Sequence, residues 1–291
     1  MEIFHINDIF DLPKLERNSC TIGKFDGIHK GHKKLISETK VDGLKTLVIT
    51  FEDLNKDQIL MDTNQKAHYL EDLGVDYLLI FPFEVIKDVF YNEFIVMLSK
   101  LNVKNITCGK DFRFGYKREG DIIDLKKKFK LNILEDEVED DIRISSTQIK
   151  YLLTEGLIEE ANSLLDKPYT INGIVVEGNK IGRKLGFPTA NIYYSNYTLP
   201  KNGVYLTIVT YKGKKYLSMT NIGHNPTLNA QEKTRLEVHI LDFNEQIYGE
   251  ELEISFVKYI REEKKYNSKD ELIKSLLDTI DICRQHQSMI E

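Results

Sequence analysis

The sequence has few of the features that mark secreted, metal-clustered or membrane proteins. Its three cysteines, Cys20, Cys108 and Cys283, lie far apart, and none belongs to a CxxC pair. An odd, scattered set indicates neither a disulfide framework nor a zinc cluster, and it suits a reducing compartment. No apolar run is long enough to span a bilayer, and acidic residues interrupt residues 1–15, unlike a signal peptide. We therefore expect a cytoplasmic protein with no membrane partner.

An excess of positive charge is missing as well. The 40 Lys and Arg residues are outnumbered by 46 Asp and Glu residues, which gives a formal net charge of -6. Proteins that coat nucleic acid need a basic surface, so we expect no nucleic-acid partner. The length of 291 residues favours a soluble protein of two domains.

The first half alternates short apolar runs with helix-like stretches. Residues 44–51, 75–83 and 104–109 are expected to form buried strands, while 65–73 and 93–101 carry apolar residues at helical spacing. This alternation predicts a doubly wound, parallel α/β sheet of Rossmann-like type. Ligands of such sheets gather at the carboxyl ends of the strands.

The second half changes to a period of two, which predicts a small β-barrel with a final helix over 269–285. Two helices, 147–153 and 158–165, come before it, and Pro168 ends their pattern. We place the boundary near Asp166, giving domains 1–166 and 167–291. The expected barrel strands are 171–176, 204–211, 215–220, 236–241 and 252–260, with a hairpin turn at Lys212-Gly213.

The segment TIGKFDGIHKGH, residues 21–32, is expected to be a strand end, a glycine turn and a helix start. Glycines let the backbone approach a ligand, and a helix N-terminus offers N–H donors and partial positive charge to a phosphate. His29 and His32 are three residues apart, so on a helix they share a face and can donate to one anion. By the residues alone, a surface histidine pair at an ordinary turn remains open.

Two later segments belong to the same half. CGKDFRFG, residues 108–115, follows a predicted strand, and ISSTQIK, residues 144–150, places hydroxyls at a helix N-terminus. Alone, the second would be a plain helix cap.

Together these segments resemble the signature of prokaryotic FMN adenylyltransferases, which are HxGH nucleotidyltransferases. The resemblance implies ATP, FMN and Mg²⁺ as ligands, with the FMN phosphate attacking the α-phosphate and pyrophosphate leaving. His29 and His32 would be catalytic, as transition-state donors. It implies nucleotide contacts at Gly23, Phe25, Asp26, Gly27, Gly31, Ser145, Ser146, Thr147 and Lys150, and flavin contacts at Asp111 and Arg113.

Two positions depart from that family's pattern. Asp53-Leu54-Asn55 stands where the family usually has Pro-His-Pro, and Lys150 stands where it usually has Arg. The first change removes an imidazole and adds a carboxylate, and the second loses bidentate phosphate geometry. One alternative is therefore an N-terminal domain that serves only as a scaffold or flavin-sensing module.

The segment GNKIGRKLGFPTAN, residues 178–191, carries glycines at a spacing of four and a cluster of positive charge. Such a mobile loop can wrap phosphates, the Thr189 hydroxyl suits Mg²⁺, and the Asn191 amide suits the same region. Glycine spacing alone would equally suit a Gly/Lys-rich hairpin loop. Downstream, in RLEVHILDF, Glu237 and His239 share one face of a predicted strand, where a carboxylate is usually only solvated.

These strings resemble the signature of riboflavin kinases. The resemblance implies that Glu237 is the base that accepts the proton of the ribityl 5'-hydroxyl as it attacks the ATP γ-phosphate. Thr189 and Asn191 would hold Mg²⁺, and Arg261 would lie near the flavin, although a surface ion pair is equally open for it. Nucleotide contacts are implied at Gly178, Lys180, Gly182, Arg183, Gly186, Pro188 and Asn191.

The two resemblances cover residues 20 to 265 in the order of the bifunctional riboflavin kinase/FMN adenylyltransferase family. They imply phosphorylation of riboflavin to FMN in the second half and adenylylation of FMN to FAD in the first. Riboflavin, FMN and ATP are the expected partners, and no protein partner is implied. Two further hypotheses stay open: a non-catalytic flavin-sensing or nucleic-acid-binding regulator, and a transferase for another phosphorylated cofactor precursor.

Overall fold

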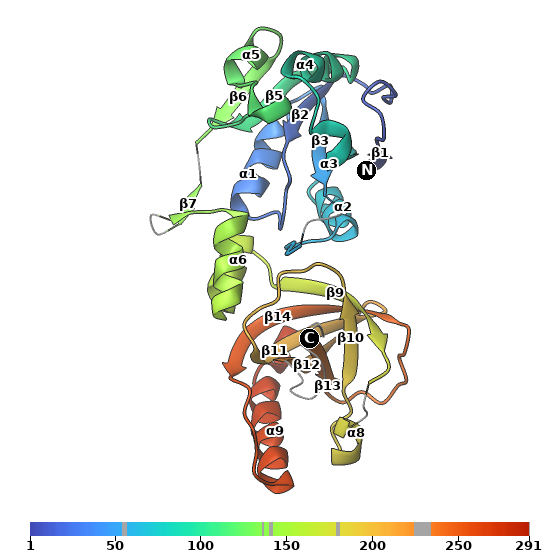
Figure 1. Cartoon of the computed structure of the whole chain (residues 1–291), viewed down its shortest axis with the longest axis vertical. Coiled ribbons are helices and arrows are strands. Elements are labelled where there is room, and N and C mark those ends of the chain that lie inside the picture. The colour runs from blue at the N-terminus through green and yellow to red at the C-terminus, as the bar shows by residue number, and fades with distance from the viewer. Residues whose placement is uncertain (54–56, 136, 140–141, 179–180, 224–233, 291) are drawn as a thin grey trace. The chain divides into compact units, whose positions relative to one another are not determined.

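The computed structural model describes residues 1–53, 57–135, 137–139, 142–178, 181–223 and 234–290 (Figure 1). The chain divides into two compact units, Met1–Ser146 and Thr147–Glu291. Each unit buries apolar clusters of its own, so each has the core that a separate domain requires.

The first unit is built on a six-stranded sheet in the order β1-β4-β3-β2-β5-β6, with every neighbouring pair parallel. The predicted parallel α/β fold is therefore confirmed. Crossover connections place helices on both faces, as the doubly wound prediction requires. The strands are β1 (Glu2–His5), β2 (Asn18–Ile22), β3 (Lys45–Glu52), β4 (Tyr77–Pro82), β5 (Val103–Gly109) and β6 (Lys130–Leu134).

Strand β3 shows how the two faces are covered. Leu47 and Ile49 belong to a cluster with residues of α4, whereas Val48 belongs to a second cluster with residues of α1 and α2. Because successive side chains of a strand point to opposite faces, a continuous apolar run is what a sheet covered on both sides requires. The helices of this unit are α1 (Lys30–Thr39), α2 (Thr63–Asp72), α3 (Phe83–Ile86), α4 (Tyr91–Lys100) and α5 (Ile122–Lys126), with a short 3₁₀ turn at Tyr116–Arg118 and a small hairpin of β7 (Val138–Glu139) and β8 (Ile142–Arg143).

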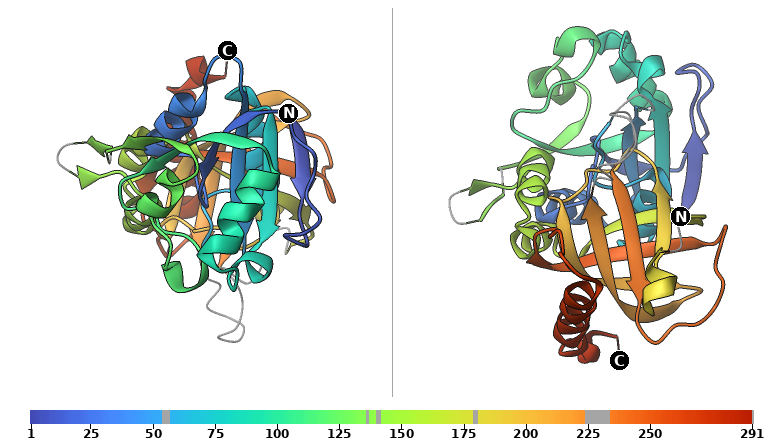
Figure 2. Two further views of the ribbon diagram at one scale, coloured as in Figure 1. Left: turned by 90° about the horizontal axis from the view of Figure 1, so that it is seen from above. Right: turned by 60° about the horizontal axis from the view of Figure 1, so that its bottom comes forward.

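The second unit contains a closed antiparallel barrel in the order β10-β13-β12-β11-β14-β9 (Figure 2), so the predicted small barrel is also confirmed. Lys212 and Gly213 both have positive φ, 48° and 76°, as expected for the predicted two-residue hairpin turn. The sequence pattern does not predict strand β10, because it follows Pro188 inside a segment rich in glycine and polar residues. The strands are β9 (Tyr169–Val176), β10 (Ala190–Tyr194), β11 (Gly203–Tyr211), β12 (Lys214–Gly223), β13 (Arg235–Ile240) and β14 (Glu251–Arg261).

Helices accompany the barrel within the second unit. The Asn162 side chain of α7 donates to the Phe256 carbonyl at 2.8 Å and accepts from the Tyr169 amide at 2.7 Å, which ties α7 to β14 and β9. Asp166, near which the sequence places a boundary, is the left-handed C-cap of α7, with φ 56°. The helices are α6 (Ser146–Glu155), α7 (Ile158–Leu165), α8 (Ile181–Leu185) and α9 (Lys269–Arg284), followed by a 3₁₀ turn at Gln287–Met289.

Candidate active sites

The first site is built on the turn between β2 and α1. Phe25, Gly27 and Ile28 have φ values of 47°, 91° and 44°, so three residues of this short turn occupy the left-handed region. That conformation is strained for a β-branched or aromatic residue and persists only where packing enforces it. The Phe25 and Ile28 side chains are fully buried in the core beside α1 and α2, which supplies that enforcement. The turn is therefore held in one conformation.

The turn brings the two predicted histidines to the same place. His29 is the N-cap of α1, and its Nδ1 accepts a hydrogen bond from the backbone N–H of His32 at 3.4 Å. The two rings are stacked, with centroids 3.7 Å apart. A Cβ at Gly31 would lie 3.3 Å from His29 Nδ1, so the glycine leaves room for the ring. The structure thus places both imidazoles at the N-terminus of α1, where an anion is favoured.

Loss of hydration disfavours the charged forms of both histidines, since the His29 side chain is buried and the His32 side chain is half-buried. Burial lowers the pKa of His29 from 6.5 to about 4, against the opposing influence of Asp26. Burial, then the neighbouring His29, lowers the pKa of His32 well below 6.5. Near pH 7 both rings are therefore neutral, and each can donate through one N–H. Within the described part of the chain, the buried Nδ1 of His32 has no hydrogen-bond partner.

Asp26 links this turn to other predicted segments. Its side chain accepts from the Leu60 amide at 2.7 Å, and its carbonyl accepts from the Ser146 hydroxyl at 2.7 Å. Ser146, the last residue of the first unit, is thus joined to the histidine turn. Of the other predicted residues in 144–150, Ser145 and Lys150 are half-buried and Thr147 is exposed in the first turn of α6. Gly23 follows β2, and its amide donates to the Ile49 carbonyl at 3.1 Å.

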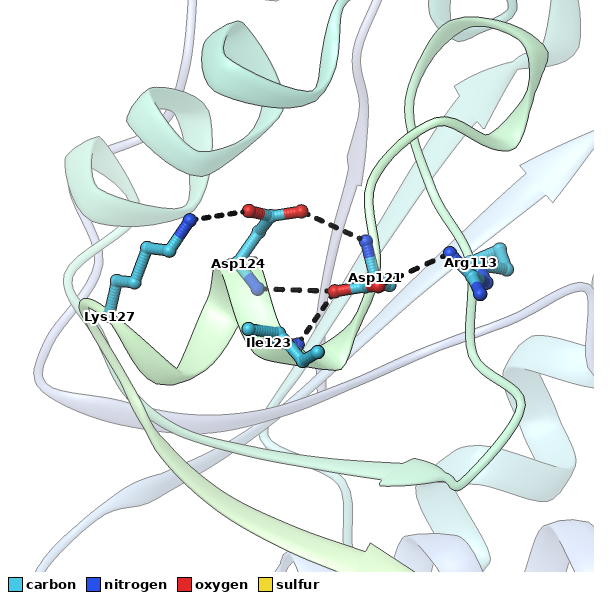
Figure 3. A network of polar contacts seen from close by, with 5 residues as sticks. All are labelled: Arg113, Asp121, Ile123, Asp124 and Lys127. Atoms are coloured by element: carbon cyan, nitrogen blue, oxygen red, sulfur yellow. Dashed lines mark hydrogen bonds and ion pairs between the residues drawn. The ribbon is translucent and has the colours of Figure 1, made fainter.

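The predicted flavin contacts of the first unit are each engaged in an ion pair. Asp111 pairs with Arg143 at 3.1 Å, which joins the segment after β5 to the end of β8. The sequence motifs do not single out Arg143, although it directly precedes the ISSTQIK string. Arg113 pairs with Asp121 at 3.3 Å, and Asp121 also caps α5 (Figure 3). Both pairs lie at the surface, so a ligand can displace them at little energetic cost.

The second site is built on the outer face of the barrel. Asn191 in β10 pairs laterally with Glu237 in β13, and Glu237 pairs laterally with Asn221 in β12. Laterally paired residues point to the same face of a sheet, so the three polar side chains form one row. The loop prediction for Asn191 is wrong, because Asn191 lies in a strand that follows the glycine-rich loop. The antiparallel register therefore brings together residues that are 46 and 16 positions apart.

Glu237 has the electrostatic character expected of a base. Its carboxylate is half-buried, and burial raises its pKa above 4.5; Arg235 opposes that shift and Glu263 adds to it. Glu263 lies on the same face, where its carboxylate accepts from the Asn221 amide at 3.1 Å. A carboxylate with a raised pKa holds a proton more tightly than an exposed one does, which suits proton abstraction from a hydroxyl.

The glycine-rich segment approaches this row closely, and it is not the uninterrupted loop that the sequence predicts, because residues Ile181–Leu185 form the short helix α8. It is called the glycine loop below. A Cβ at Gly178 would collide with the Asn191 side chain, and one at Gly182 would collide with the Phe187 carbonyl and lie 3.3 Å from Thr189 Oγ1. Only glycine permits both approaches. Gly186 has φ 90°, which also favours glycine. Lys180 lies outside the described residues.

A pocket of about 210 Å³ opens beside this loop. Arg183, Pro188 and Thr189 line it from the loop side, and Ile247 and Tyr248 line it from the segment after β13. The loop is fixed to the barrel because His239 Nδ1 lies 2.7 Å from the Pro188 carbonyl. The pocket combines apolar walls with a guanidinium and a hydroxyl, a combination that suits a nucleotide.

Arg261 stands at the end of β14 and reaches α9. Its Nε donates to the Thr279 hydroxyl at 3.3 Å. Arg261 also pairs laterally with Val204, which pairs with Asn221 of the polar row. Its guanidinium is therefore anchored on the terminal helix, whereas the sequence left a surface ion pair open for it. Of the departures noted in the sequence, Asp53 is half-buried after β3, while Leu54 and Asn55 lie outside the described residues.

The described ranges contain neither a metal cluster nor a membrane span. Across them, no group of three or more His, Cys, Asp or Glu side chains is placed to hold a metal ion. No helix there is both long and apolar enough to cross a bilayer.

Comparison with known proteins assigns a family to each half of the chain. A family model described as FAD synthetase matches residues 12–148, and one described as riboflavin kinase matches residues 165–287. The chain is also similar over 98% of its length to a crystal structure described as a macrolide-efflux protein from Streptococcus pneumoniae, with 99% of that chain covered, 30% identity and a TM-score of 0.88. This likeness supports the two-unit architecture.

Curated relatives carry both descriptions in one name. A Buchnera aphidicola protein named bifunctional riboflavin kinase/FMN adenylyltransferase is 37% identical in an alignment 309 positions long, gaps included, which covers 98% of this chain and 99% of the relative. A Listeria monocytogenes protein of the same name is 37% identical in an alignment 278 positions long, which covers 88% of each chain. With both halves matched in order and nearly the full length aligned, the chain belongs to the bifunctional riboflavin kinase/FMN adenylyltransferase family.

Proposed function

We infer that this protein makes FAD in two steps, by phosphorylating riboflavin with ATP in its second unit and adenylylating FMN in its first. The observation that carries the inference is the lateral pairing of Asn191 with Glu237 beside the glycine loop. This arrangement puts a base, a phosphate-region amide and a glycine-rich backbone within one small area. The name of the family describes both reactions, and the order of the two matched halves supports their assignment to the two units.

In the second unit, Glu237 accepts the proton of the riboflavin 5'-hydroxyl as that oxygen attacks the γ-phosphate of ATP. The bond between the γ-phosphorus and the bridging oxygen breaks, and ADP leaves. The raised pKa of Glu237 supports this role, because a base must hold the proton it removes. Arg183 and the glycine loop hold the triphosphate, and Arg261 orients the flavin from the end of β14.

Mg²⁺ is the metal that the family implies, and the oxygen atoms of Thr189 and Asn191 fit it. A hydroxyl and an amide oxygen are hard ligands, and Mg²⁺ usually keeps several waters and substrate phosphates beside one or two protein ligands. Gly178 and Gly182 bring backbone close to Asn191 and Thr189, respectively, because neither glycine has a Cβ that would collide there. When bound, the ion neutralises charge on the transferring phosphoryl group.

In the first unit, the FMN phosphate attacks the α-phosphate of ATP and pyrophosphate leaves. The attacking phosphate oxygen carries no proton that a base must remove, so the site needs donors and placement. The neutral His29 and His32 rings, with the N-terminus of α1, supply donors to the α-phosphate region. Asp111 and Arg113 exchange their surface ion pairs for contacts with FMN.

Product analysis tests both assignments. Purified protein is incubated with ATP and Mg²⁺, once with riboflavin and once with FMN, and the flavins are separated over time by chromatography. We expect riboflavin to give FMN and then FAD, and added FMN to give FAD directly. Formation of FMN from riboflavin with no FAD in either incubation would contradict the adenylyl-transfer assignment and favour a scaffold or flavin-sensing first unit. The absence of any new flavin would contradict both assignments.

A further inference from the structure

Lys66 is a lysine buried beside the first site. It lies in α2 and is only 7% exposed, which is unusual because lysine is almost never fully buried unless it is paired. Its ammonium donates to the Lys24 carbonyl at 2.9 Å and to the Thr50 hydroxyl at 3.2 Å. The Thr50 hydroxyl donates in turn to the Lys24 carbonyl at 3.1 Å. Three elements therefore meet at one buried cation.

These three elements position the histidine turn. Lys24 directly precedes the left-handed stretch that begins at Phe25, and Thr50 lies near the carboxyl end of β3. Tying the Lys24 carbonyl to Thr50 and to α2 fixes the point at which the chain leaves the sheet. Because that turn ends at the N-cap of α1, any shift at Lys24 is passed on to the rings of His29 and His32.

The Lys66 ammonium also contributes charge to the site. The titratable groups that act on His32 are His29 from the N-cap, Asp26 from the turn and Lys66 from α2. Glu52 at the end of β3 is hydrogen-bonded to the Thr63 hydroxyl at the start of the same helix. Lys66 disfavours protonation of His32, with a smaller effect than burial and His29 have, whereas Asp26 favours it.

We propose that Lys66 is a positioning residue for adenylyl transfer, which anchors the histidine turn through its hydrogen bonds to the Lys24 carbonyl and the Thr50 hydroxyl. The inference rests on the proposed adenylyl-transfer function of the first unit. It adds a residue that the FMN adenylyltransferase signature strings of the sequence do not contain.

The test compares Lys66→Met with the wild type and with Lys66→Arg, using FMN adenylylation from about pH 5.5 to 8. We expect kcat/KM of Lys66→Met to fall about 10- to 100-fold at pH 8, since small displacements of positioning groups have effects of this size. The loss should lie mainly in kcat, because the turn places groups that act in the transition state. Lys66→Arg keeps a donor for both oxygen atoms, so it should recover most of the wild-type rate.

Hydrogen exchange of residues 1–146 in the same preparations is the folding control for the first unit, and we expect it to match the wild type. Phosphorylation of riboflavin should stay at the wild-type rate. A wild-type rate of FMN adenylylation in Lys66→Met would overturn the proposal. If wild-type protein forms no FAD from FMN, the proposed function fails instead. Should Lys66→Met not fold, Thr50→Val removes one anchor and keeps the ammonium. Its FMN adenylylation should fall about 5-fold with an unchanged pH profile, and a wild-type rate would contradict the anchoring.

Discussion

Burial shifts the pKa values of the central residues of the two units in opposite directions. It lowers the pKa of His29 in the first unit and raises the pKa of Glu237 in the second. In the first unit, burial lowers the pKa of His29 to about 4, so the ring stays neutral and cannot take up a proton near pH 7. In the second unit, burial raises the pKa of Glu237, so the carboxylate becomes a better proton acceptor. The nucleophiles explain the contrast: a riboflavin hydroxyl must lose a proton, whereas an FMN phosphate need not. On the proposed function, one chain separates base catalysis from placement by burying a different side chain in each unit.

The two sites also differ in how the backbone fixes their residues. The histidines are set by a strained turn that buried side chains hold in place. Glu237 and Asn191 are instead set by strand register, with a close-packed glycine loop beside them. Substitutions in the strained turn should therefore leave riboflavin phosphorylation intact, and substitutions in the paired strands should leave FMN adenylylation intact.

The largest effect is expected for Glu237→Gln, which keeps the shape of the side chain and removes the base. Loss of a general base lowers rates by about 10² to 10⁴, so kcat for riboflavin phosphorylation should fall by about that factor. Conversion of added FMN to FAD by the same protein should remain at the wild-type rate. Steady-state assays of both half-reactions check this, and a kinase rate within about threefold of the wild type would remove Glu237 from the mechanism.

The next effect is expected for His29→Ala/His32→Ala, which removes both imidazole donors. Removing a single transition-state donor lowers kcat by about 10² to 10³, so FAD formation from FMN should fall at least that far. Riboflavin phosphorylation should continue, and FMN should accumulate. Chromatography of the flavins over time measures both, and FAD formation at the wild-type rate would exclude the two histidines as donors.

A stability effect follows from the depressed pKa of His29. The unfolded chain takes up the proton near pH 6.5 and the folded chain only near pH 4, so the stability that this group contributes is complete above pH 6.5 and is lost as pH falls to 4. The loss should be about 3 kcal/mol for the first unit. Hydrogen exchange followed by mass spectrometry measures it for each unit. His29→Gln should reduce the pH dependence in residues 1–146, and an unchanged dependence would contradict burial of the neutral ring.

The smallest effect is expected at the cap of α5. Asp121 accepts from the amides of Ile123 and Asp124, at 2.8 and 3.3 Å, and pairs with Arg113 (Figure 3). Asp121→Ala should lower the free energy of unfolding by about 1 kcal/mol, the usual loss for a helix cap. Lys127→Ala removes only an exposed ion-pair partner of Asp124, so it should change the free energy of unfolding by no more than about 0.3 kcal/mol. Equal effects of the two substitutions would show that helix capping by Asp121 is not what stabilises this part of the first unit.

Much of the fold could be predicted from the sequence because the decisive patterns are local. Apolar runs locate β3, β4 and β5, and the period of two locates β9 and β11 to β14, each within three residues of the observed bounds. Strand β10 escapes prediction because its pairing with β9 and β13 depends on register, which no local pattern states. The predicted start of α2 is two residues late, because the capping box of Asp62 and Gln65 begins the helix at Thr63.

The sequence motifs of the candidate sites could be predicted, but the contacts that bring distant residues together in each site could not. The strings containing His29 and Glu237 are visible in sequence, whereas the contact between Ser146 and Asp26 arises only on folding. Lys66 shows the limit most clearly, because a lysine in an amphipathic helix is normally expected to face water. Its burial depends on the carbonyl and hydroxyl that other elements supply, and those partners are distant in sequence.

The most direct test of the contrast between the units is a pair of pH-dependent rate ratios. For riboflavin phosphorylation, the wild-type rate is divided by that of Glu237→Gln; for FMN adenylylation, it is divided by that of His29→Ala/His32→Ala. Each ratio cancels the ionisation of ATP and the flavin. We expect the first ratio to fall as pH is lowered from about 8 towards the raised pKa of Glu237, and the second to stay constant to about pH 5.5. A constant first ratio, or a second ratio that changes with pH, would contradict the account.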